Sequence, residues 1–224
     1  MFSIVSTYKN RFNHICQSLP SYLDQDTKVP YEIIVVDYNS PDAVSDYLKS
    51  HKTGKIVHAK CCNADGFHIS KARNIGAKIA KYNFVLFVDI DTVFENSMID
   101  YLSSIVNNSF YFAAENSQEH FNIINGGLIC VNKETHEKIY GFDERMHGWG
   151  YEDIDYKKRL EKIECFYKEI SCDNYSCLAH SDKDRVLYYS LNKFESWFRN
   201  QQISKTIWES RNFGQYDNLE INYY

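Results

Sequence analysis

Apolar runs and amphipathic segments alternate along the first 115 residues of the chain. The runs at residues 31–37 and 83–89 predict buried strands, the run at 2–7 predicts a short apolar strand, and the run at 55–60 predicts a weaker strand. Four intervening segments carry helical spacing or a proline that opens a helix, at residues 10–23, 41–48, 70–82 and 96–106. This β-α-β order predicts an α/β fold whose central sheet is mostly parallel and is flanked by helices.

The pattern changes after residue 115, and five of the nine glycines lie between Gly126 and Gly150. We expect a strand, a short helix at 133–139, a bent loop, a helix at 151–163 and strands near 165–169 and 175–179. Helical spacing returns from 184 to about 199. Since we find no internal repeat and no linker, we expect a single domain followed by a C-terminal helical tail.

Composition narrows the function. The chain has 224 residues and a net charge of −5, so a general attraction to nucleic acid is not expected. The first residues turn polar too early for a signal peptide, and no apolar run is long enough to span a bilayer. Seven cysteines at irregular spacing do not form a disulfide framework. We therefore expect reduced thiols in the cytoplasm.

Polar side chains lie at the carboxyl ends of three of the predicted strands. In an α/β sheet, ligands bind beyond the carboxyl ends of the strands. A carboxylate at one strand end is often only a helix cap or a turn former. Polar and charged side chains at three strand ends together favour a ligand site. The residues are Thr7, Tyr8 and Arg11 after the first strand, Asp37, Asn39 and Ser40 after the second, and Asp89 and Asp91 after the strand at 83–89.

Asp89 and Asp91 form a D-x-D triplet in FVDIDTVF. Two acids one residue apart after a buried strand can share a divalent cation, and such a cation neutralises the phosphates of a nucleotide. The triplet alone is a weak signal; its place directly after VLFV strengthens it.

The stretch HGWGYEDIDYKKRL, at 147–160, crowds three acids beside a tryptophan flanked by glycines. Crowded carboxylates cost stability unless a cation, a ligand or a catalytic role offsets the repulsion. The acids precede the bases, as they do when acids lie at the N-terminus of a helix. The plainer interpretations are a buried tryptophan anchor and helix-end acids balanced by the helix dipole.

Four segments of the first half together resemble the nucleotide half of glycosyltransferases with the GT-A fold, including family 2-type enzymes. The segments are STYKNR, VVDYNS, SKARNIG and FVDIDTVF. The segment from NGGLICVN to GWGYEDIDYKKRL resembles the acceptor half of the β-1,4-galactosyltransferases and the related bacterial polysaccharide polymerases. The resemblance implies one GT-A (Rossmann-like) domain over 1–185, divided into a nucleotide-sugar half (1–115) and an acceptor half (116–185), with a helical extension over 186–224.

The resemblance implies a role for each matched residue of the donor and metal sites. Asp91 and His180 would coordinate Mn²⁺ or Mg²⁺, with Asp89 at the ribose or the water shell of the metal, and Cys177 stands where the family has a methionine. His180 on its own would more often be a structural histidine. The donor would be held by Thr7, Tyr8, Arg11, Asp37 and Asn39 around the nucleoside, by Lys71 and Arg73 near the diphosphate, and by Gly127 and Trp149 around the sugar.

Asp153 matches the family's general base, which takes a proton from the acceptor hydroxyl, and Glu152 would hydrogen-bond the donor sugar. The resemblance implies inversion at the anomeric carbon. Tyr151 replaces a glycine of the family motif, and Ile154 replaces an acid that binds the acceptor sugar.

These observations predict an inverting, metal-dependent glycosyltransferase. It would move a hexose or N-acetylhexosamine from a UDP-sugar to a hydroxyl of an oligosaccharide or glycoconjugate acceptor in surface polysaccharide synthesis. The alternative is a non-catalytic nucleotide-sugar- or glycan-binding subunit with the same fold. A sugar-1-phosphate nucleotidyltransferase fits less well, because STYKNRFNH lacks the glycines of their phosphate loop. The aromatic and basic tail is compatible with peripheral contact at the inner face of the membrane.

Overall fold

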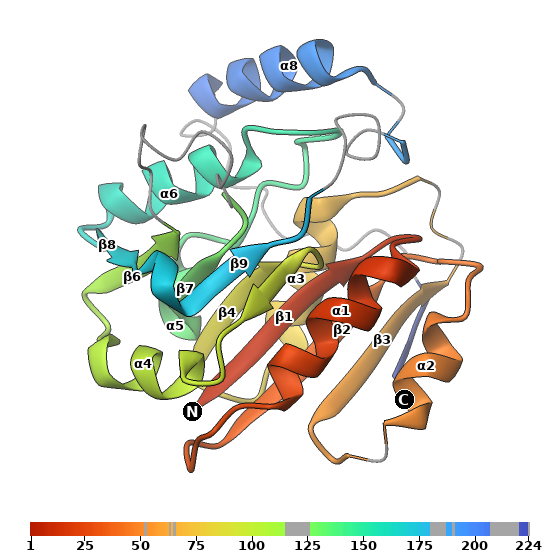
Figure 1. Ribbon diagram of the computed structural model, residues 1–224. Helices are drawn as coiled ribbons and strands as arrows, with labels where there is room; N and C mark the ends of the chain where they lie inside the picture. The colour runs from red at the N-terminus through yellow and green to blue at the C-terminus, as the bar shows by residue number, and fades with distance from the viewer. Residues whose placement is uncertain are drawn as a thin grey trace.

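The computed structural model is built around a mixed central sheet (Figure 1). The structure describes residues 1–51, 53–62, 64, 66–114, 126–179, 187–189 and 191–206 and the backbone of 220–223. Within those residues the sheet has eight strands in the order β10-β3-β2-β1-β4-β7-β6-β8. Its strands are β1 (Phe2–Tyr8), β2 (Tyr31–Asp37), β3 (Ile56–Cys62), β4 (Phe84–Asp89), β6 (Phe110–Ala114), β7 (Ile129–Asn132), β8 (Phe166–Ile170) and β10 (Glu220–Tyr223). Strands β5 (Thr92–Phe94) and β9 (Tyr175–Cys177) form a separate antiparallel pair.

The centre of the sheet is parallel. Strand β1 pairs in parallel with β2 and with β4, β2 pairs in parallel with β3, and the antiparallel partners β7 and β10 join outside this core. The register places Tyr8 opposite Asp37 and Thr7 opposite Asp89. The polar residues that follow three strands therefore meet at one edge of the sheet.

Helices cover both faces of the sheet (Figure 1). One apolar cluster joins the sheet to α1 (Phe12–Leu23), α2 (Val44–Ser50) and α4 (Met98–Ile105). The other joins it to α3 (Ile69–Ile79) and α6 (Glu152–Lys162), near α5 (Lys133–Lys138). Helix α8 (Lys193–Thr206) crosses above α6, away from the sheet, and a short 3-10 helix covers Cys172–Asn174.

The structure confirms the predicted α/β fold class with a mostly parallel central sheet flanked by helices. The predicted C-terminal helical tail is helical only in part, because β10 adds a strand to the central sheet by pairing with β3. The sequence interpretation missed β5, β6 and β10. The tail helix also differs from the prediction, because it covers Lys193–Thr206 rather than 184–199. The proposed boundaries at 115/116 and 185/186 fall on residues outside the described part of the chain, so the domain division stays a prediction.

Candidate active site

Arg73 on α3 joins two of the predicted site acids. Its side chain is fully buried, with Nη2 donating to Asp89 Oδ1 at 2.9 Å and Nη1 donating to Glu152 Oε1 at 3.1 Å. Burial lowers the pKa of Arg73, but Asp89, Glu152 and the neighbouring Asp153 more than offset this, so its pKa is raised. The guanidinium thus links Asp89 at the end of β4 to Glu152 at the start of α6, although Glu152 follows Arg73 by 79 positions.

Asp89, the first acid of the D-x-D triplet, and Asp153, the predicted base, both lie against the turn at Gly126 and Gly127. A Cβ atom on Gly126 would lie 2.1 Å from Asp153 Oδ2, and one on Gly127 would lie 2.2 Å from Asp89 Oδ2. A side chain at either position would therefore force the neighbouring carboxylate to move. The two carboxylates therefore flank consecutive residues of one turn.

Burial and neighbouring acids raise the pKa values of two acids of this site, Glu152 and Asp89. Burial and the charge of Asp153 raise the pKa of Glu152 to about 7, although Arg73 opposes the shift. Burial raises the pKa of Asp89 as well, with Arg73 lowering it and Asp91 raising it. A further cation placed among these groups would lower their mutual repulsion.

Two of the predicted metal ligands, Asp91 and Asp89, have the chemistry that a divalent cation binds. Asp91 and Asp89 supply the hard oxygen donors that Mn²⁺ and Mg²⁺ accept, and the backbone N–H of Leu178 donates to the Asp91 carbonyl oxygen at 2.7 Å. Because β5 pairs with β9, the chain that leads to His180 passes directly beside the D-x-D triplet. His180 itself lies outside the described residues, and among those described no group of three or more His, Cys, Asp or Glu is arranged as a metal site. The roles of Asp91, His180 and Cys177 stay predictions.

The residues predicted to hold the nucleoside lie at the ends of β1 and β2. Asp37 is fully buried; its Oδ1 accepts from the Ser40 N–H at 2.8 Å, and its Oδ2 lies 3.5 Å from His58 Nε2. Tyr8 is also fully buried, and its hydroxyl donates to Asp42.

Three further residues predicted for the nucleoside surround these two. Thr7 is buried, and Arg11 is half-buried just before α1. Asn39 has a left-handed backbone (φ 55°), and its amide donates to the Ala64 carbonyl at 3.3 Å. The geometry gathers these residues at one sheet edge without showing what they bind.

Lys71 and Arg73 both lie on α3, but they have different neighbours. Arg73 contacts the site acids, whereas Lys71 is near two histidines. Burial is the largest cause that lowers the pKa values of His68 and His147, and the charge of Lys71 lowers each of them by a smaller amount. The rings of these two histidines lie 4.6 Å apart. Lys71 is therefore near His147, which begins the loop around Trp149 (residues 147–151, the tryptophan loop). Its predicted contact with a diphosphate is untested.

The tryptophan loop ends in an unusual residue. Tyr151, which stands where the family motif has glycine, adopts the left-handed conformation that favours glycine, with φ 75°. Trp149 is half-buried, and Ile154 on the outer side of α6 is 38% exposed. Tyr151 therefore has a backbone conformation that a glycine would adopt without strain.

The sequence interpretation missed two site residues. Lys157 lies one helical turn after Asp153; burial lowers its pKa and Asp153 raises it. Burial raises the pKa of Tyr189, with Glu152 as the next cause, and its ring lies 5.6 Å from that of Phe67. The i, i+4 spacing could have revealed Lys157, but nothing local in the sequence marks Tyr189.

All seven cysteines lie within the described residues, and none of them forms a disulfide there. Within the described residues, no helix is long and apolar enough to cross a membrane. Neither the predicted cytoplasmic location nor peripheral membrane contact is tested by these observations, and Trp208 and Arg211 of the tail lie outside the described residues.

Comparisons with known proteins match two successive parts of the chain. Residues 3–108 match the model of glycosyl transferase family 2, and residues 109–181 match that of the N-terminal domain of galactosyltransferase. The hyaluronan synthase of Pasteurella multocida is 23% identical over 227 aligned residues, which cover 75% of this chain and 23% of the synthase. The chain thus spans less than a quarter of that relative.

Solved structures share the fold. Drosophila β1,4-galactosyltransferase 7 in complex with xylobiose superposes with a TM-score of 0.62 at 14% identity, covering 91% of this chain and 79% of that one. Staphylococcus aureus TarS superposes with a TM-score of 0.66 at 17% identity, covering 87% of this chain and 41% of that one. With both family matches on one GT-A scaffold, the protein is a glycosyltransferase of the GT-A fold.

Proposed function

We propose that this glycosyltransferase is inverting and metal-dependent, and that it transfers a hexose or N-acetylhexosamine from a UDP-sugar to a hydroxyl of a glycan acceptor. The observation that carries the proposal is the Gly126–Gly127 turn, against which both Asp153 and Asp89 pack. This common contact supports a single site for the predicted base and the predicted metal-binding triplet. Surface polysaccharide or glycoconjugate synthesis is the setting that we infer.

The donor site is proposed from the strand ends and from structural relatives. A point mutant of the same Drosophila enzyme has been solved with manganese, UDP-Gal and xylobiose, and TarS has been solved with UDP-GlcNAc. In this chain, Asp37 and its neighbours at the ends of β1 and β2 would hold the uridine. Asp91 and His180 would hold Mn²⁺ or Mg²⁺, with Asp89 beside them, and the cation would neutralise the departing diphosphate.

The chain's own residues would carry the transfer. Asp153 accepts the proton of the acceptor hydroxyl, whose oxygen attacks the anomeric carbon from the side opposite to the diphosphate, so the configuration inverts. Glu152, fixed by Arg73 at 3.1 Å, hydrogen-bonds the donor sugar. Trp149 offers an apolar wall for a sugar ring. Lys157 lies one helical turn after Asp153 on α6, and the two side chains interact electrostatically.

The test is release of UDP from a panel of UDP-sugars with and without Mn²⁺, together with oligosaccharide acceptors. Asp91→Ala should abolish metal-dependent release. Asp153→Asn should lower turnover at least about 100-fold, as expected for loss of a general base, while UDP binding persists. Asp46→Asn, an exposed acid on α2, is the control and should behave as wild type.

Two results would count against the proposal. Binding of UDP without turnover on any donor and acceptor would favour the non-catalytic subunit instead. An α-linked product from an α-linked donor, read from NMR coupling constants, would refute inversion.

Peripheral membrane contact through the tail is a separate part of the proposal. Phe194 and Phe198 are 86% and 61% exposed on α8, beside the basic Arg199. Sedimentation with anionic phospholipid vesicles, lost in Phe194→Ser/Phe198→Ser, would support contact. Equal sedimentation of both proteins would refute it.

A further inference from the structure

The loop that leads into the proposed catalytic residues has a backbone that needs external support. Gly148, Gly150 and Tyr151 have φ values of 82°, 91° and 75°, and α6 begins at the next residue, Glu152. Tyr151 in particular adopts a conformation that side chains rarely take. A strained segment keeps one conformation only where its surroundings fix it.

Helix α8 supplies hydrogen bonds to this loop from one stripe of polar side chains. Ser196 Oγ accepts from the Trp149 N–H at 3.1 Å and lies 2.9 Å from the Trp149 carbonyl oxygen, to which it can donate. The amide of Asn200, one turn later, donates to the Gly150 carbonyl at 2.8 Å. Both side chains are fully buried. The stripe therefore contacts the loop on both sides of the peptide that joins Trp149 to Gly150.

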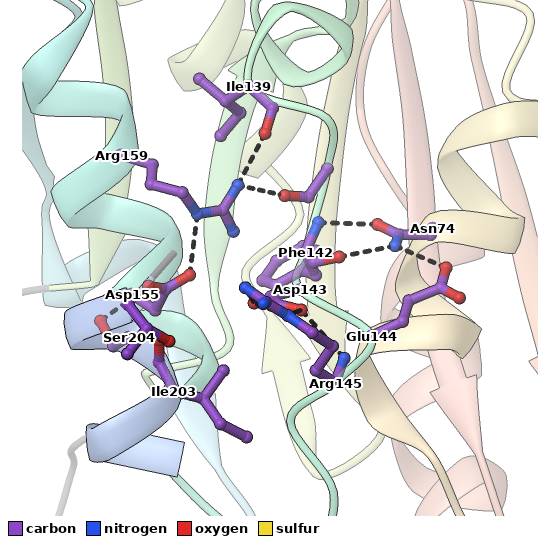
Figure 2. A network of polar contacts seen from close by, with 12 residues as sticks. Asn74, Ile139, Phe142, Asp143, Glu144, Arg145, Asp155, Arg159, Ile203 and Ser204 are labelled. Carbon is purple, nitrogen blue, oxygen red and sulfur yellow. Dashed lines mark hydrogen bonds and ion pairs between the residues drawn. The ribbon is translucent and has the colours of Figure 1, made fainter. Parts of the chain in front are cut away.

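The third member of the stripe holds α6 itself. The Ser204 hydroxyl donates to Asp155 Oδ1 at 2.7 Å, and Asp155 Oδ2 accepts from Arg159 Nε at 2.8 Å (Figure 2). Arg159 Nη1 also donates to the Ile139 and Gly141 carbonyls at 2.7 and 2.6 Å. Residues 196, 200 and 204 follow i, i+4, i+8 spacing, so they form one face of α8.

Close packing accompanies these bonds. A Cβ atom on Gly148 would lie 2.5 Å from Ser196 Cβ, so the loop backbone lies directly against α8. The Trp197 ring packs edge-on against Tyr151, with centroids 5.3 Å apart. Lys193 Nζ lies 4.4 Å from the centroid of the Trp149 ring. These contacts come from the same helix as the hydrogen bonds and act on the same loop.

Burial on α8 is the reverse of that on an ordinary surface helix. It buries Ser196, Asn200 and Ser204, whereas Phe194 is 86% and Phe198 61% exposed. Apolar burial therefore does not explain how α8 docks; its polar bonds and its contacts with the loop do.

We propose that α8 is a positioning element of the active site, whose Ser196, Asn200 and Ser204 hold the Trp149–Gly150 loop and the first turn of α6 so that Glu152 and Asp153 keep their place. Neither matched family region reaches this helix, because the matches end at residue 181. The catalytic consequence rests on the proposed transferase function, whereas the structural hold of α8 on the loop does not.

The test compares two amide-to-acid changes on the same helix. Asn200→Asp replaces the buried donor to Gly150 with an acceptor, whereas Gln202→Glu makes the same change on the exposed face. Ser204→Ala, with Ser204→Thr as the variant that keeps the hydroxyl, is a milder second pair. Readouts are amide hydrogen exchange of peptides covering 147–152 and 84–89, the Kd for UDP, and kcat and KM for UDP release.

Asn200→Asp should speed exchange at 147–152 about tenfold and lower kcat about tenfold, since a buried hydrogen bond is lost. Exchange at 84–89 and the Kd for UDP should stay near wild type, and Gln202→Glu should change nothing. Ser204→Thr should restore what Ser204→Ala loses. Equal exchange in Asn200→Asp and Gln202→Glu, unchanged kcat despite faster exchange, or weaker UDP binding together with lower kcat would each overturn the proposal. If wild type transfers no sugar, the proposed function fails, and the exchange comparison still decides whether α8 holds the loop.

Discussion

Replacing Arg73 with methionine should destabilise the protein strongly, because Arg73 compensates two acids at once. The substitution keeps the apolar volume of the side chain but removes hydrogen bonds to Asp89 at 2.9 Å and to Glu152 at 3.1 Å. Each bond to a charged partner contributes about 1.5–3 kcal/mol. Breaking a buried ion pair by removing one partner costs about 3–5 kcal/mol. We therefore expect the free energy of unfolding to fall by about 3–5 kcal/mol.

The assay is urea unfolding at pH 8 in EDTA, so that no metal ion stands in for the lost guanidinium. Arg73→Met/Glu152→Gln should recover part of the loss, since the second change neutralises one of the abandoned carboxylates. Lys81→Met is the control: Lys81 is 55% exposed, and its partner Glu32 also accepts from Ser3 at 2.6 Å, so the loss should stay within about 1 kcal/mol. A loss below about 1 kcal/mol for Arg73→Met would refute the reasoning, because it would mean that the acids do not depend on the guanidinium.

Three further predictions concern glycines and a carboxyl group. Gly76→Ala should cost about 1–3 kcal/mol in urea unfolding, because its Cβ would lie 2.2 Å from a valine carbon of β1, whereas Gly54→Ala, with nothing within 4 Å of its Cβ, should be near neutral; equal losses would contradict this. Gly127→Ala should weaken Mn²⁺-dependent UDP binding while the fold is retained, because its Cβ would displace the Asp89 carboxylate; wild-type affinity by calorimetry would count against the placement. Burial raises the pKa of Glu152 to about 7, above the value of about 4.3 in the unfolded chain, so ionisation of Glu152 opposes folding. In EDTA, the free energy of unfolding should therefore fall as the pH rises from about 5 to about 8. The fall should be smaller in Glu152→Gln.

The central strands could be predicted from the sequence because their chemistry is local. β1, β2 and β4 are apolar runs that end in polar residues, and the parallel register then brings Thr7, Asp37 and Asp89 to one edge. The pairing of Arg73 with Glu152 could not be predicted, since no local pattern connects residues 79 positions apart. Strand β6 (Phe110–Ala114) was missed although FYFAA is apolar, because so short a run has no clear period.

The tail shows why periodicity can mislead. An apolar pattern identifies the buried face of a helix only when the buried face is apolar. In α8 the buried stripe includes Ser196 and Asn200, and Phe194 points to solvent. The predicted range of 184–199 therefore missed the end of the helix at Thr206.

The hold of α8 on the tryptophan loop also has a consequence for synthesis of the chain. Trp149 and Gly150 bond to residues that follow them by 47 and 50 positions. The parallel strands β1, β2 and β4 are all complete by residue 89, so they can pair while the C-terminal part is still being translated. A nascent chain would then form the sheet edge of the nucleotide half first, and would lock the loop beside Glu152 and Asp153 only after α8 had emerged.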